Sequence, residues 1–140
     1  MRRFASKDSK RDFYILYTLV FGVIAGFIYY QFAGNGKSLV WSHDGIPQHL
    51  NSLAYYGRYL REVLHTIFVE HKLELPMWDM NIGYGSDILT TLHYYVIGDP
   101  LTLLSVFVPA DKTEVLYEVL IFLRIYLAGI SFSVFCFYHK

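Results

Sequence analysis

The sequence has little of what disulfide-stabilised, metal-binding or nucleotide-using proteins need. Its 140 residues include a single cysteine, Cys136, so it has neither a disulfide framework nor a thiolate metal site. No phosphate-binding loop, dinucleotide-binding glycine motif, His-Glu-x-x-His or Gly-x-Ser-x-Gly element is present. Acidic and basic residues balance at twelve each. These absences argue against a cytoplasmic nucleotide-using enzyme.

Charge is also absent from Phe13 to Ala33, a continuous apolar and aromatic run. As a helix this run would extend roughly 30 Å, the thickness of a bilayer's hydrocarbon core. A helix satisfies its own backbone in lipid, so we predict an all-α membrane protein with a transmembrane helix at 13–33. A cleaved signal peptide is the alternative, but the run is too long and Gln31-Phe32-Ala33 is a poor cleavage site.

A second apolar segment, 115–138, predicts a second transmembrane helix. Residues 1–12 carry five basic residues, and the 81 residues of 34–114 carry only five more. By the positive-inside rule, both termini are cytoplasmic and 34–114 is an extracellular loop. This loop offers no basic footprint for nucleic acid. Arg124 would lie about 14 Å into the second helix, where a costly charge indicates either a functional residue or a structural ion pair.

The long loop is predicted to contain two amphipathic juxtamembrane helices, at about 46–68 and 100–108. The first follows from apolar residues at helical spacing, and the second from the cap-then-proline pair Asp99-Pro100. Residues 74–87 are interpreted as an irregular loop that is rich in turn-forming residues. The apolar residues of the first helix are Ile46, Leu50, Leu53, Leu60, Leu64 and Ile67.

Asp44 lies about ten residues beyond the first predicted span, just before the 46–68 helix. A carboxylate near the membrane face, flanked by His43 and His49, can serve as a general base. Aspartate is also a favoured N-cap, and the local sequence by itself favours the cap; the two roles are compatible. The spacing of these three residues matches no standard short metal motif, so no metal site is assigned.

Aromatic residues of the loop have two interpretations. They suit an aromatic belt at the membrane–water interface, which the sequence favours, or the wall of a pocket for a sugar or a lipid headgroup. These residues are Trp78, Tyr84, Tyr94 and Tyr95.

Several short motifs follow one another in a defined order. The first span is followed by His-Asp-Gly-Ile-Pro-Gln-His (43–49), Leu-Pro-Met-Trp-Asp (75–79), Asn-Ile-Gly-Tyr-Gly-Ser-Asp (81–87), Gly-Asp-Pro-Leu (98–101) and, in the second span, Arg-Ile-Tyr-Leu-Ala-Gly (124–129). This order resembles the N-terminal part of the YfhO family of bacterial multi-span membrane proteins, over about residues 13–138.

The resemblance implies a glycosyltransferase of the GT-C type, which moves sugar from a polyprenyl-phosphate donor to a cell-envelope polymer such as teichoic acid. Asp44 occupies the place of the catalytic acidic residue of GT-C enzymes. The expected substrate-binding residues are His43, Gln48, His49, Trp78, Asp79 and Arg124. No cofactor is implied beyond the donor substrate, and a need for a divalent metal stays open.

Family members have a dozen or more spans, so this chain is expected to be an inactive N-terminal fragment of a multi-span fold. Its partners would be membrane lipid, the donor, the acceptor polymer and the remaining helices of the parent protein. The alternative is a transporter, permease or envelope-assembly component without catalytic activity, in which Arg124 lines a path. A third interpretation is a two-span protein that oligomerises, for which Gly22 and Gly26 provide Gly-x-x-x-Gly spacing.

Overall fold

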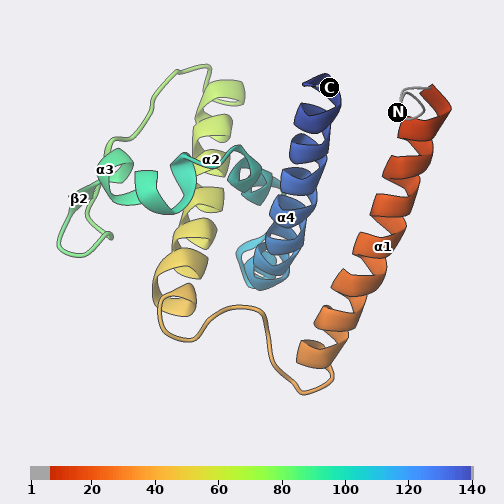
Figure 1. Ribbon diagram of the computed structural model, residues 1–140. Coiled ribbons are helices and arrows are strands. Elements are labelled where there is room, and N and C mark those ends of the chain that lie inside the picture. The colour runs from red at the N-terminus through yellow and green to blue at the C-terminus, as the bar shows by residue number, and fades with distance from the viewer. Residues whose placement is uncertain (1–6, 140) are drawn as a thin grey trace. The chain divides into compact units, whose positions relative to one another are not determined.

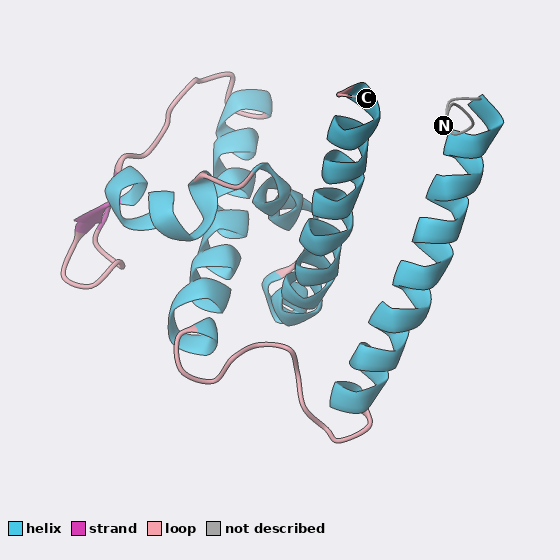
Figure 2. Ribbon diagram, in the orientation of Figure 1, coloured by secondary structure: helices cyan, strands magenta, loops and turns pink. Residues whose placement is uncertain are grey.

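The structure is a computed structural model that describes residues 7–139, which are mostly helical (Figure 1). Within these residues, one two-stranded sheet interrupts the helices (Figure 2). This confirms the predicted all-α fold class. Arg2 and Arg3, two of the basic residues on which the predicted topology rests, lie outside the described residues. The chain divides into two compact units, one of residues 1–39 and 121–140, and one of residues 40–120.

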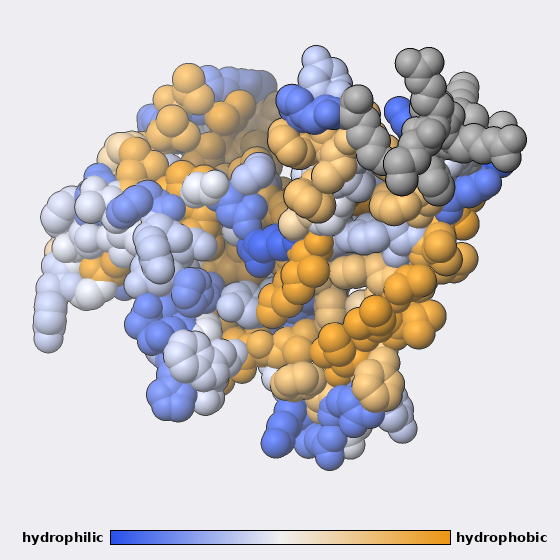
Figure 3. All heavy atoms as spheres, in the orientation of Figure 1, coloured by the Kyte–Doolittle hydropathy of each residue, from blue (hydrophilic) through white to orange (hydrophobic). Residues whose placement is uncertain are grey.

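The first unit contains helix α1 (Lys7–Ala33) and most of helix α4 (Thr113–Tyr138). Two stretches, Ser9–Ala33 and Ala110–Tyr138, are long and apolar enough to cross a membrane. Hardly any of their apolar residues is buried, and hydrophobic side chains cover the visible face of α1 (Figure 3). A helix that is apolar all round and left uncovered by protein is suited to lipid.

Polar contacts join α1 to α4 within the first unit. The Tyr17 hydroxyl donates to the backbone carbonyl of Tyr126 at 3.0 Å, and the Ser133 hydroxyl donates to the Tyr14 hydroxyl at 3.2 Å. Gly129 permits this approach, because a Cβ there would collide with the Tyr17 side chain. The partners follow opposite orders along the two helices, so α1 and α4 are antiparallel. In lipid, such interhelical hydrogen bonds and small residues promote helix association.

The second unit is built on helix α2 (Asn51–Phe68), which continues directly from the π-helix η1 (Gly45–Leu50). The predicted apolar stripe describes its buried face only in part. Leu53 is buried, but Ile46 and Leu64 are exposed. Packing in the unit instead buries a face of α2 that includes a tyrosine and a glycine; its buried residues are Leu53, Tyr56, Gly57 and Val63.

The 3₁₀-helix η3 (Pro100–Phe107) packs closely against α2. Asp99 is its N-cap and accepts a hydrogen bond from the Leu101 N–H at 2.9 Å. Its C-terminal end is held by Arg61 of α2, whose Nη1 donates to three backbone carbonyls; these belong to Ser105 (3.0 Å), Val106 (3.3 Å) and Val108 (2.8 Å). The last carbonyls of a helix lack partners within the helix, so the Arg61 guanidinium caps η3 and attaches it to α2.

Between α2 and η3 the chain forms a small antiparallel hairpin of β1 (Trp78–Asp79) and β2 (Ser86–Asp87). The interpretation of 74–87 as an irregular loop is therefore wrong at these four residues. Gly85 has a φ of 103°, and a Cβ there would lie 2.9 Å from the Met80 sulfur. Glycine thus lets the hairpin close. Two helices follow, α3 (Ile88–Leu92) and the π-helix η2 (His93–Ile97), and the 3₁₀-helix η4 (Ala110–Lys112) later precedes α4.

Candidate functional site

Asp44 is exposed and precedes the first turn of η1. Asp44 occupies the N-cap position of η1, as the sequence predicts, but its side chain makes no capping hydrogen bond to the helix backbone. The side-chain carboxylate instead accepts a hydrogen bond from Gln48 Nε2 at 3.2 Å. An exposed carboxylate steadied by a neighbouring amide keeps lone pairs directed to solvent, where a substrate hydroxyl can approach.

Gln48 links Asp44 to a second helix. The Tyr95 hydroxyl of η2 donates to Gln48 Oε1 at 3.0 Å, and the His49 ring meets the Tyr95 ring edge-on, with 5.2 Å between centroids. η1 and η2 are both π-helical, a geometry often found at functional sites. The structure therefore brings together Asp44, Gln48 and His49, and adds Tyr95. We call these four residues the Asp44 cluster.

His43 lies outside these contacts. Its ring stacks on Trp41 with 5.4 Å between centroids, and its Nδ1 lies 3.4 Å from the Ser42 hydroxyl. Among residues 7–139, no three His, Cys, Asp or Glu side chains are grouped so that they could hold a metal ion.

Asp79 belongs to a different hydrogen-bond network. It accepts from the Tyr55 hydroxyl at 2.5 Å and from both the backbone N–H and the side-chain amide of Asn81, at 2.8 and 2.9 Å. The Tyr55 hydrogen bond and the Asn81 N–H hold the pKa of the Asp79 carboxyl below its usual range. Asp79 is therefore an anchored anion and a weak base.

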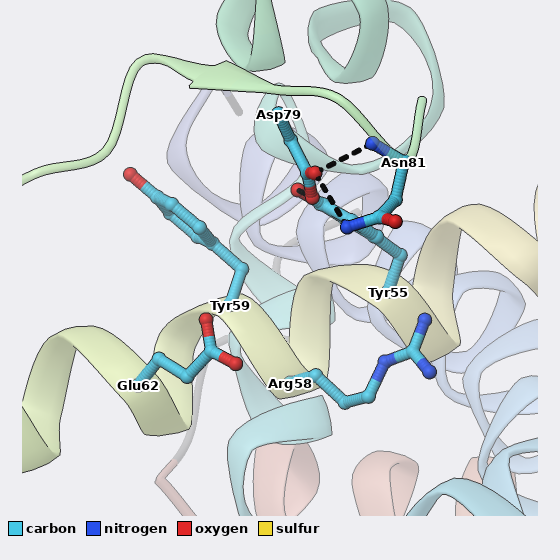
Figure 4. Close-up of a pocket in the computed structure, with 6 residues that line it drawn as sticks. All are labelled: Tyr55, Arg58, Tyr59, Glu62, Asp79 and Asn81. Atoms are coloured by element: carbon cyan, nitrogen blue, oxygen red, sulfur yellow. Dashed lines mark hydrogen bonds between the residues drawn. The ribbon is translucent and has the colours of Figure 1, made fainter. Parts of the chain in front are cut away.

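This network forms one wall of a cavity of about 450 Å³. Asp79 and Asn81 come from the hairpin, and α2 supplies the residues across from them (Figure 4). Burial raises the pKa of Tyr59, and burial and Asp79 raise that of Tyr55, so both remain neutral phenols at physiological pH. The lining residues are Tyr55, Arg58, Tyr59, Glu62, Asp79 and Asn81.

Trp78 belongs neither to the Asp44 cluster nor to the lining of the cavity. Trp78 is exposed on β1, and its indole N–H points to the Met80 sulfur at 3.3 Å. Arg124 is half-buried on α4, in the part of the helix that belongs to the first unit, whereas the Asp44 cluster and the cavity belong to the second.

Sequence reasoning missed the cavity residues on α2. Tyr55, Arg58 and Glu62 lie off the apolar stripe, where polar side chains are usually solvated, and Tyr55 meets Asp79 from 24 positions away. The spacing of Tyr55, Arg58, Tyr59 and Glu62 at intervals of three or four residues does place them on one helix face. That pattern was the available signal.

Comparison with known protein families gives a match over most of the chain. The family model described as bacterial membrane protein YfhO matches residues 16–140. No curated protein and no solved structure matches the chain significantly. The family match covers most of the chain, and both membrane-compatible helices fall largely within it. The chain therefore belongs to the YfhO family of bacterial membrane proteins.

Proposed function

We propose that this chain is the N-terminal part of a membrane glycosyltransferase that moves sugar from a polyprenyl-phosphate donor to a cell-envelope polymer such as teichoic acid. The observation that carries the proposal is the state of Asp44. It is an exposed carboxylate near the start of the first long loop, whose side chain makes no capping hydrogen bond and accepts one from Gln48. In the GT-C enzymes that the family resembles, the catalytic acidic residue has this place.

The proposed reaction is a single displacement with inversion. The acceptor hydroxyl attacks the anomeric carbon, the bond from that carbon to the phosphate oxygen breaks, and polyprenyl phosphate leaves. The hydroxyl proton passes to the Asp44 carboxylate. Because carboxylates are weak bases, much of the acceleration must come from positioning of the two substrates in a site closed to water.

Other residues have supporting roles in this proposal. Gln48 orients Asp44, and His43 and His49 bind the acceptor beside it. A cation must stabilise the leaving phosphate, and Arg124 is the candidate within this chain's spans. Trp78 and Asp79 would contact a second part of the substrate. The remaining donor site would be built from further helices of the parent protein.

The proposed topology places this chemistry outside the cell. The positive-inside rule favours a cytoplasmic N-terminus, and the antiparallel arrangement of α1 and α4 suits two successive spans. Residues 34–114 would then face the outer surface, where polyprenyl-linked sugars are used by GT-C enzymes.

Asp44→Asn at the chromosomal locus tests the proposal, because the rest of the reading frame stays intact. Asparagine can still accept the Gln48 hydrogen bond and has nearly the same volume, but it cannot take a proton. We expect normal protein levels and glycosylation of the envelope polymer reduced roughly a hundredfold or more, measured as sugar per polymer unit.

Asp111→Asn is the matched control, since Asp111 is an exposed aspartate of the same loop in η4. It should leave glycosylation unchanged. Full decoration in the Asp44→Asn strain, together with loss of decoration in a deletion strain, would overturn catalysis by Asp44 and favour a transport or assembly role.

A further inference from the structure

The cavity beside Asp79 has features of a binding site distinct from the Asp44 cluster. It shares no lining residue with that cluster, and all of its lining residues lie between positions 55 and 81 of the second unit. Its volume of about 450 Å³ is within the range of small-molecule sites. A ligand in it would not contact the Asp44 cluster.

One wall of the cavity is organised without any ligand. Asp79 is held from two directions, by Tyr55 of α2 and by Asn81 of the hairpin. These bonds tie the hairpin to α2, so Asp79 and Asn81 keep their positions opposite the helix (Figure 4). A wall that is already ordered loses little conformational entropy when a ligand binds.

The opposite wall offers both hydrogen-bond donors and acceptors. Arg58 and the Tyr59 hydroxyl can donate, and the Glu62 carboxylate can accept. Among the described residues, the Tyr59 hydroxyl has no hydrogen-bond partner, and its pKa, raised by burial, keeps it protonated. Tyr55 and Tyr59 also bring aromatic rings to the wall.

The balance of charge selects among ligand classes. Two carboxylates and one guanidinium line the cavity, so a phosphate or another anion would meet net repulsion. Asp79 already accepts three hydrogen bonds and is offset by nearby Arg58, so a cation would meet only the charge of Glu62, which is exposed and screened by solvent. Alternating donors and acceptors beside aromatic rings instead match a pyranose, whose hydroxyls both donate and accept and whose C–H face packs on an aromatic ring.

We propose that this cavity binds one neutral sugar residue of a glycan, as a recognition subsite separate from Asp44. This deepens the glycosyltransferase proposal, in which Asp79 contacts a second part of the substrate, but its test is separate because binding is measured without turnover. The two proposals can fail separately. Full glycosylation in the Asp44→Asn strain would count against the catalytic role of Asp44 only, and failure of the cavity to bind a sugar would count against the subsite only.

Saturation-transfer NMR on the full chain in nanodiscs tests the proposal with four defined probes. Methyl α-glucopyranoside and N-acetylglucosamine are the neutral sugars, glycerol 3-phosphate is the anion and choline is the cation. We expect at least one neutral sugar to bind with a dissociation constant on the order of millimolar, about 4 kcal/mol, and neither charged probe to bind.

Two variants assign that binding to the cavity. Glu62→Gln and Tyr59→Phe remove one acceptor charge and one donor, and each should weaken sugar binding about threefold to tenfold. Glu114→Gln and Tyr84→Phe are the matched controls at exposed positions outside the cavity and should have no effect.

Three results would overturn the subsite. One is the absence of binding by both neutral sugars, and another is binding of glycerol 3-phosphate or choline in their place. The third is sugar binding that neither Glu62→Gln nor Tyr59→Phe changes. Glu62 is exposed, so its replacement leaves the fold intact and the test remains decisive.

Discussion

At the scale of single residues, two aspartates of the same loop have different chemistry. Asp44 is exposed, and its carboxylate accepts a side-chain hydrogen bond from Gln48. Asp79 accepts three and has its pKa lowered, with the Tyr55 hydrogen bond as the largest cause. Stabilising the anion makes a carboxylate a poorer proton acceptor. Asp79 is therefore suited to hold structure and ligand, and Asp44 is the better candidate for a base.

The lowered pKa of Asp79 makes a prediction about stability and pH. A depressed folded-state pKa contributes stability above the unfolded value, about pH 4, and this contribution is lost as the pH falls through the folded value. The difference in apparent melting temperature between the wild-type protein and Asp79→Asn should be constant from pH 7 to about pH 4 and shrink below it.

Tyr55→Phe removes the largest cause of the lowered pKa of Asp79. In a Tyr55→Phe background, the difference in melting temperature between the proteins with Asp79 and with Asn at position 79 should therefore be smaller at every pH above about 4. Tyr84→Phe is its control, since Tyr84 is fully exposed. A melting difference that does not vary with pH, in either background, would show that Asp79 is not stabilised as an anion.

At the scale of elements, the contact of α2 with η3 organises the second unit. Gly57 and Arg61 lie one turn apart on α2, and both meet the C-terminal end of η3. The glycine allows close approach of the backbones, and the guanidinium satisfies three carbonyls. Because α2 also carries the cavity residues, this contact helps to position them.

Gly57→Ala tests the close approach. A Cβ at this position would lie 2.7 Å from the Ser105 carbonyl oxygen, which is backbone and cannot move aside cheaply. We expect destabilisation of about 1–3 kcal/mol, seen as a lower apparent melting temperature in detergent.

Gly26→Ala is the control, because a Cβ there meets nothing within 4 Å and alanine favours a helix. If the Gly57→Ala protein had an apparent melting temperature no lower than that of Gly26→Ala, the close contact between α2 and η3 at Ser105 would be contradicted.

At the scale of the whole molecule, the two candidate spans bracket a folded unit. α1 and α4 are antiparallel, and residues 40–120, which lie between them in the sequence and include the first turns of α4, form a compact unit. The charge asymmetry predicts that this unit lies outside the cell. The orientation decides which substrates the Asp44 cluster and the cavity can meet.

Cysteine accessibility measures that orientation. In a Cys136→Ser background, Tyr84→Cys places a thiol at a fully exposed position of the hairpin, and Ser9→Cys places one near the start of α1. An impermeant thiol reagent should label Tyr84→Cys in intact cells and Ser9→Cys only after lysis. The reverse pattern would invert the topology and move the proposed chemistry to the cytoplasmic side.

The sequence by itself determined the features that depend on neighbouring residues. The charge-free run and the second apolar segment predict membrane-compatible helices, because hydropathy and backbone satisfaction are properties of contiguous residues. Asp99 before Pro100 predicts a helix start, and Asp99 is the N-cap of η3. The ordered short motifs were sufficient to recognise the family.

The tertiary structure alone decided which polar side chains meet. Tyr55 reaches Asp79 across 24 positions, and Arg61 reaches Ser105 across 44. Such pairs depend on how the hairpin and η3 return to α2, which no local pattern encodes. The same holds for Asp44, whose neighbours favour a cap in the sequence, but whose side chain bonds Gln48 while Gln48 turns to Tyr95 on η2. The contact between Gln48 and Tyr95, 47 positions apart, is the part of this cluster that the local sequence does not encode.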